Sequence, residues 1–115
     1  MIRKAKDMRL QERENLRGGD GVIHTLHLVE PAEMFGKGIL CSVMTVDPGA
    51  SIGEHPHGPD AELYYMLEGE LCVRDNGAEP VVMQVGDAMW TCNGETHSVR
   101  NETDKPARMI AFVLA

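Results

Sequence analysis

Two histidines and a glutamate near the middle of the chain have the residue types and spacing of a metal-binding site. His55 and His57 are separated by one residue, so on an extended chain both side chains leave the same face. Their Cα atoms are then about 6.7 Å apart, which lets two imidazoles converge on one ion. Residues 58–60, Gly-Pro-Asp, are typical of a turn, and this turn places Glu62 at the start of the next strand, beside the histidines.

A second segment, residues 86–101, supplies another histidine behind a glycine turn. Together the two segments resemble the two sequence motifs of the cupin family. The first motif, with gaps of five, one, four and six residues, falls on Gly49, His55, His57, Glu62 and Gly69. The second falls on Gly86, Gly94, His97 and Asn101, with Cys92 where the family usually has proline. Two ordered blocks of spaced positions are a far more specific signal than a lone His-x-His pair.

The resemblance implies an all-β fold, the double-stranded β-helix or jelly-roll barrel of cupins, with a metal site inside it. The ligand positions of the family fall on His55, His57, Glu62 and His97. Three neutral imidazoles and one carboxylate suit one divalent transition metal, namely manganese, iron, nickel, cobalt or zinc. Four ligands on an octahedral ion leave about two positions for water, a substrate or dioxygen.

Neighbouring residues are weaker candidates for a role at this site. Tyr64 and Met66 have the same strand parity as Glu62, so they are expected to point into the same cavity and to form part of a pocket. A simple packing role for Tyr64 is the alternative. His24 and His27 are three residues apart and face opposite sides of a strand, so they cannot chelate one ion jointly and are expected to be structural or exposed.

The elements that must position these residues are short strands. Apolar runs of four to nine residues, separated by glycines and prolines, predict strands near 22–29, 39–47, 62–67, 70–75, 79–83, 88–91, 97–101 and 107–114. Asn76-Gly77 is the strongest hairpin signal, because both central positions of a type I′ turn need a positive φ. Residues 4–17 are compatible with an irregular or short helical lead-in and equally with a strand.

The chain is predicted to be an N-terminal arm, residues 1–21, followed by a single cupin β-barrel domain, residues 22–115. Alternating strand positions are expected to supply the core of the barrel: Val43, Leu63, Leu71, Val73, Val81 and Phe112. A small barrel leaves apolar strand faces that one sheet cannot cover, so we also expect a homodimer.

Charge and composition exclude several classes of protein. The 115 residues carry a net charge of −7, and residues 18–115 alone hold fifteen acidic against five basic groups. Such a body repels phosphate backbones, so nucleic acid is not an expected partner. The longest apolar run is far below the roughly 20 residues of a membrane helix, and the basic N-terminus leads into no signal-peptide core, so a cytoplasmic location is expected. Three widely spaced cysteines fit neither a disulfide framework nor a zinc finger.

The predicted function is that of a metal-binding cupin that acts, as an enzyme, on a small oxygen-rich anion such as a carboxylate or an enolate. The three-histidine, one-glutamate set is similar to that of oxalate-degrading cupins and of several dioxygenases, and no general acid is identifiable from the sequence. A module that binds a metal or small ligand without turnover is one alternative, and a zinc-dependent sugar isomerase is another. Fold alone does not decide among these functions.

Overall fold

Ten strands form along the chain, separated by turns rich in glycine, proline and asparagine. The computed structural model describes residues 1–115. The strands are β1 (Arg9–Glu14), β2 (Val22–Val29), β3 (Gly38–Val46), β4 (Ser51–His57), β5 (Ala61–Glu68), β6 (Leu71–Asp75), β7 (Val81–Met83), β8 (Ala88–Thr91), β9 (Glu95–Arg100) and β10 (Ala107–Leu114). Three 3-10 turns complete the structure: η1 (Ala5–Asp7), η2 (Leu16–Gly18) and η3 (Pro31–Met34). None of the helical segments has the length and apolar character needed to span a bilayer.

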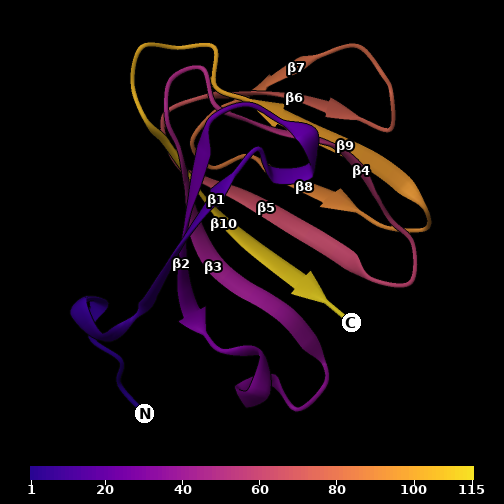
Figure 1. Ribbon diagram of the computed structural model, residues 1–115. Helices are drawn as coiled ribbons and strands as arrows, with labels where there is room; N and C mark the ends of the chain where they lie inside the picture. Colours follow the sequence, from indigo (N-terminus) through magenta and orange to yellow (C-terminus); the bar gives the residue numbers. More distant parts are fainter.

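The strands form two antiparallel sheets. The larger sheet has the order β1-β2-β3-β10-β5-β8 and the smaller has the order β4-β9-β6-β7. In Figure 1 the smaller sheet lies at the top and right of the view, and the N-terminus extends away at the lower left. Strands far apart in sequence are neighbours, as where the C-terminal strand β10 lies between β3 and β5. This two-sheet arrangement is the predicted all-β double-stranded β-helix.

Two strands go beyond the eight that were predicted. Residues 9–14, within the lead-in whose structure was left open, form β1 and pair with β2 at one edge of the larger sheet. The histidine segment forms β4 at one edge of the smaller sheet. The β6–β7 hairpin confirms the turn signal, because Asn76 and Gly77 both have positive φ angles, of 50° and 72°, and the Ala78 N–H donates to the Asp75 carbonyl.

The hydrophobic core lies between the two sheets and is rich in methionine. Five of the eight methionines belong to it: Met44, Met66, Met83, Met89 and Met109. Flexible thioether side chains fill the irregular space that closely packed strands leave in a small barrel. Leu71 and Val73 are buried there as predicted.

The other residues of the predicted core do not belong to the central cluster. Leu63 and Phe112 pair with each other across β5 and β10, and both alternate with residues that point into the core, so they lie on the outward face of the larger sheet. Val43 is buried, as predicted, but its side chain lies on the same outward face, since its neighbour Met44 occupies the core. Val81 lies opposite the buried Val73, but it is 60% exposed because β7 is an edge strand. Continuous apolar runs do not reveal which alternate residues point inward.

The outward face of the larger sheet is consequently apolar over most of its width. The strand register aligns one row of residues, Leu10, Leu26, Val43, Ile110 and Tyr65. A second row consists of Cys41, Phe112, Leu63 and Trp90. Antiparallel sheets with a free face normally carry polar residues on it, so this surface has the composition of a covered one.

Candidate metal centre

The histidines of β4 point into the barrel because the strand contains a β-bulge. Ile52 lies opposite Val99 of β9, whereas His55 lies opposite His97, so β4 has one residue more than β9 between the two pairs. The extra residue interrupts the strict alternation, and Ile52, His55 and His57 are all buried. The bulge therefore changes which face the histidines occupy.

A glycine in the bulge also joins the N-terminal arm to this strand. A Cβ atom on Gly53 would lie 2.0 Å from the carbonyl oxygen of Arg17, and one on Gly19 would lie 2.2 Å from that of Ser51. Both positions therefore require glycine for the backbones to approach. The close approach holds η2 and the Arg17 segment beside the histidine strand.

The structure brings together all four residues that the sequence selects. His55 and His57 come from β4, Glu62 from β5 and His97 from β9, so both sheets contribute. One ligand atom from each residue lies within 4.8 Å of those of the other three, and all four residues are buried. This geometry allows the four side chains to hold one cation.

Each imidazole has one nitrogen occupied by a neighbouring oxygen. The Nδ1 atom of His55 lies 2.7 Å from the Gly53 carbonyl oxygen, and that of His57 lies 2.9 Å from Oδ1 of Asp60. The Nδ1 atom of His97 lies 2.8 Å from the hydroxyl of Thr91. When Nδ1–H donates to these oxygens, Nε2 of each neutral ring carries the free lone pair, which is the tautomer that binds metals.

The Nε2 atoms converge on one another and on Glu62. Nε2 of His55 and of His97 are 3.0 Å apart, and Oε1 of Glu62 lies 3.0 Å from Nε2 of His57 and 3.2 Å from that of His97. Despite this proximity, Nε2 of His57 is buried without a hydrogen-bond partner, since the distance is short but the direction is not that of a hydrogen bond. Lone pairs that face one another are stabilised by a cation, so the donor set fits a divalent metal.

The protonation behaviour of His55 agrees with this arrangement. Burial is the largest cause that lowers the pKa of His55, and the nearby His97 and Arg17 lower it further, against the Gly53 carbonyl, which raises it. A lowered pKa keeps the ring neutral, and only a neutral imidazole has a nitrogen free to bind a metal.

The two predicted pocket residues have different surroundings. Tyr64 lines the cavity beside the four residues and stacks on His97, with ring centroids 4.8 Å apart. Burial and the negative charge of Glu62 raise the pKa of the Tyr64 hydroxyl well above its usual value. Met66 has the expected inward parity but belongs to the closed core, where its register partner is Met109. It is fully buried and lines no part of the cavity.

His24 and His27 face opposite sides of β2, as their spacing requires. His24 lies between Glu12 and Asp47, and the hydrogen bond to Asp47 is the largest cause that raises its pKa. His27 is buried on the inward side and lines the far end of the cavity. Burial and the charge of Arg9 lower its pKa. The three cysteines are free.

The cavity above the four residues has a volume of about 370 Å³ and contains groups that the motif analysis did not select. Asp60 and Thr91 hold imidazole rings, whereas the first segment of the chain supplies part of the wall with Arg9, Gln11, Arg13 and Arg17. The sequence signal that could have identified the residues of this segment is strand alternation: if residues 9–14 form a strand, the odd-numbered side chains all point to one side, which here is the cavity.

A two-sheet jelly-roll barrel with three histidines and a glutamate beside an internal cavity defines the cupin class of proteins. Comparison with known families supports this assignment, because the model described as "Cupin domain" matches residues 42–113. The chain belongs to the cupin family.

Individual relatives extend the likeness over the whole chain. An oxalate-binding protein from Thermotoga maritima is 32% identical over 114 residues, which cover 99% of this chain and 93% of that protein. A tetracenomycin polyketide synthase protein from Streptomyces glaucescens is 30% identical over 86 residues, 75% of this chain and 57% of the relative.

Solved structures give the same result for the fold. The crystal structure of a protein described as a predicted oxalate decarboxylase, also from Thermotoga maritima, matches with a TM-score of 0.92 and 32% identity, and 99% of this chain and 98% of that chain are covered. A polyketide cyclase from Streptomyces resistomycificus matches with a TM-score of 0.77 at 18% identity, covering 99% of this chain and 80% of that chain. At that identity the second likeness concerns the fold alone.

The contact between Asp60 and His57 yields a test of the site. Asp60→Ala removes the acceptor that orients the His57 ring, so the affinity for Zn²⁺ is expected to fall about 10–100-fold. Glu54→Ala is the matched control, because Glu54 is exposed and accepts a hydrogen bond from the Thr96 hydroxyl instead. Competition with a chromophoric chelator measures both affinities. An unchanged affinity in Asp60→Ala, or an equal loss in both variants, would contradict the assignment.

Proposed function

We propose that His55, His57, Glu62 and His97 bind one divalent transition metal and that the chain uses it to bind and transform a small oxygen-rich anion, such as a carboxylate or an enolate. The observation that carries this proposal is the convergence of three Nε2 atoms and one carboxylate at the wall of a cavity, with each Nδ1 atom already occupied. When bound, the metal supplies a Lewis acid that polarises a carboxylate or enolate oxygen.

The residues of the chain set the conditions for this chemistry. The Gly53 carbonyl, Asp60 and Thr91 fix the orientation of the imidazoles. A tyrosine hydroxyl is protonated at neutral pH, and burial and the charge of Glu62 raise the pKa of Tyr64 further, so its hydroxyl is a hydrogen-bond donor rather than a base. The cavity of about 370 Å³ has the size of a small-molecule site.

The Thermotoga relatives support a carboxylate as the ligand. The curated protein is named for binding oxalate, and the matching Thermotoga structure, also 32% identical over nearly the whole chain, is described as a predicted oxalate decarboxylase. We therefore place the reaction in the oxalate decarboxylase or dioxygenase class, with manganese or iron as the metals that such chemistry commonly uses. Nickel, cobalt and zinc suit the same donor set.

Binding without turnover is the alternative that one observation favours. The only carboxyl groups that line the cavity are Asp60 and Glu62. Asp60 is engaged by the His57 ring and Glu62 lies against the histidines, so neither is a free general acid. A zinc-dependent sugar isomerase, the other alternative from the sequence, lacks a comparable observation.

Titration of oxalate into the Mn²⁺-loaded protein tests the proposal. Oxalate is expected to bind the metal-loaded protein and to lose at least ten-fold in affinity after a chelator removes the metal. The reason is that the metal cation attracts the oxalate dianion, which the net negative charge of the protein otherwise repels. His24→Ala, which changes a histidine outside the cluster, should bind like the parent protein. Carbon dioxide release or oxygen uptake then distinguishes an enzyme from a binding module. Equal oxalate affinity with and without metal would overturn the proposal.

We further propose that the chain forms a homodimer through the apolar outward face of the larger sheet. Tyr65 and Trp90 are exposed there, at 39% and 50%, among apolar neighbours. The two central rows of this face carry no charged residues, so the face can pack against a second copy of itself without like-charge repulsion. A twofold interface requires such self-complementarity. The division of the chain into an arm, residues 1–21, and a barrel domain, residues 22–115, stays a prediction. The cytoplasmic location and the absence of nucleic-acid and membrane partners stay predictions from charge and composition.

Sedimentation tests the dimer. The parent protein is expected to sediment at about twice its mass of 12.7 kDa at micromolar concentration, and Tyr65→Lys should shift it toward the monomer by burying an unpaired charge. Val82→Lys is the control, because Val82 is similarly exposed, at 52%, but lies in β7 of the smaller sheet. The single tryptophan, Trp90, should show red-shifted fluorescence when the dimer dissociates. A parent protein with monomeric mass at these concentrations would contradict the proposal.

A further inference from the structure

The end of the cavity opposite the four clustered residues is positively charged. Arg3 and Arg9 are neutralised by Glu33 and Glu30, with N–O distances of 2.9 and 2.8 Å. Arg13 lines the cavity at this end, and Arg17 lines it nearer the histidine strand. Neither has a carboxylate partner. Arg13 is half-buried, so its charge is only partly solvated. An unpaired guanidinium on a cavity wall is a binding group for an anion.

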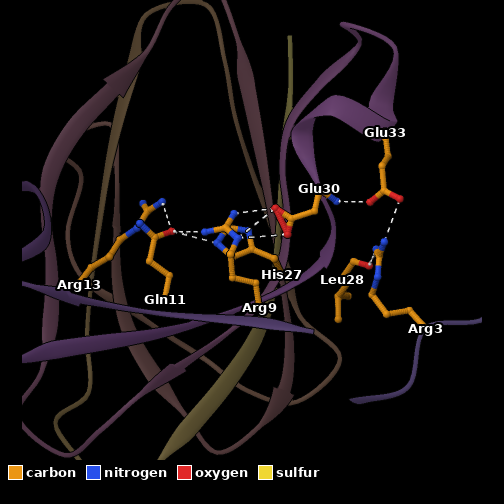
Figure 2. A network of polar contacts seen from close by, with 8 residues as sticks. All are labelled: Arg3, Arg9, Gln11, Arg13, His27, Leu28, Glu30 and Glu33. Atoms are coloured by element: carbon orange, nitrogen blue, oxygen red, sulfur yellow. Dashed lines mark hydrogen bonds and ion pairs between the residues drawn. The ribbon is translucent and has the colours of Figure 1, made fainter. Parts of the chain in front are cut away.

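Gln11 organises this end of the cavity. Its Oε1 atom accepts hydrogen bonds from the guanidinium of Arg13 at 3.1 Å and from Nε2 of His27 at 3.0 Å, and Figure 2 shows it between these groups. A third and longer contact, of 3.4 Å, comes from Arg9. The carbonyl oxygen of the amide is therefore saturated, and its NH₂ group has no partner within the chain. Gln11 and Arg13 together present free N–H donors to the cavity.

His27, at the same end of the cavity, has a ring nitrogen without a hydrogen-bond partner. It is 3% exposed and lines the cavity, and its Nδ1 atom is buried without any hydrogen-bond partner. Because Nε2–H donates to Gln11, Nδ1 of the neutral ring is an acceptor without a donor. Buried polar atoms in native proteins are nearly always satisfied by protein, water or ligand, so Nδ1 calls for a donor such as water, whereas the groups at this end that can bind an anion are the N–H groups of Arg13 and Gln11.

The distance between the two ends limits which ligands can reach both. Glu62 and Tyr64 are on β5, His27 is on β2 and Gln11 is on β1, and the sheet order puts β10 and β3 between β5 and β2. At about 4.8 Å per strand, β5 and β2 are about 14 Å apart along the curved sheet. The long side chain of Arg13 spans part of this separation. Gln11 and Arg13 lie one strand further, on β1. A dicarboxylate with a spacer therefore suits the two ends better than oxalate, whose carboxylates share one C–C bond.

We propose that Arg13 and Gln11 form a second anion-binding site, which holds the far carboxylate of an extended dicarboxylate whose near carboxylate binds at the metal. This inference rests on the proposed metal site and names its preferred ligand class as dicarboxylates longer than oxalate. It assigns to the N-terminal strand β1 a role in specificity. Arg17, whose charge acts on His55 and Tyr64, contributes to the positive potential between the two ends.

Chain length provides a test that needs no variant. Calorimetric titration of the Mn²⁺-loaded protein with oxalate, succinate, glutarate and the monocarboxylate pentanoate compares one carboxylate with two and short spacers with long ones. Glutarate is expected to bind at least ten-fold more tightly than pentanoate and more tightly than oxalate. Equal affinities for glutarate and pentanoate would overturn the inference. Tight binding of oxalate in that case would leave the proposed metal function intact, whereas no binding of any carboxylate would overturn both.

Variants of the second site locate the effect. Arg13→Gln should reduce glutarate affinity about ten-fold while Mn²⁺ stoichiometry and oxalate affinity stay those of the parent, and Arg13→Lys should restore part of the loss. Arg108→Gln is the matched control, because Arg108 also lacks a carboxylate partner but is exposed on β10, away from the cavity. Unchanged glutarate affinity in Arg13→Gln would overturn the inference, as would an equal loss in Arg108→Gln.

Discussion

The structure depends on one electrostatic constraint, the burial of three imidazole lone pairs and a carboxylate facing one another. Such a group is costly in an apolar interior unless a cation compensates it. The surrounding chain holds the arrangement in place: the bulge at Gly53 turns His55 and His57 inward, and oxygens of Gly53, Asp60 and Thr91 fix the three rings. These contacts account for conformations that packing alone would not favour.

The barrel is divided between a closed core and an open polar cavity. The closed core consists of methionines and aliphatic residues. The cavity wall carries histidines, Glu62 and polar residues of β1 beside apolar residues such as Leu40 and Val113. Inward-pointing strand residues therefore stabilise the barrel in the closed core and supply binding groups in the cavity. The N-terminal segment forms part of the cavity wall.

The spaced sequence motifs predicted the fold and the candidate ligands much better than the hydrophobicity pattern predicted the core. The four candidate ligands and the fold follow from positions 49–69 and 86–101, since turns and strand parity limit where those side chains can point. Leu63 and Phe112 face outward rather than into the core, because a continuous apolar run has no polar residue to mark its outward side. The sequence alone could not predict the bulge in β4 or the position of Arg13 on the cavity wall, since both depend on how the strands pair.

Metal stoichiometry, measured by elemental analysis after equilibration with Mn²⁺ and removal of free ion, tests the central claim most directly. The parent protein and His24→Ala should each retain one equivalent, because His24 lies outside the cluster. The His55→Ala, His57→Ala double variant should retain none, and its melting temperature should not respond to chelator, since a ligand stabilises only the state that binds it. Equal stoichiometry in the parent and the double variant would contradict the account.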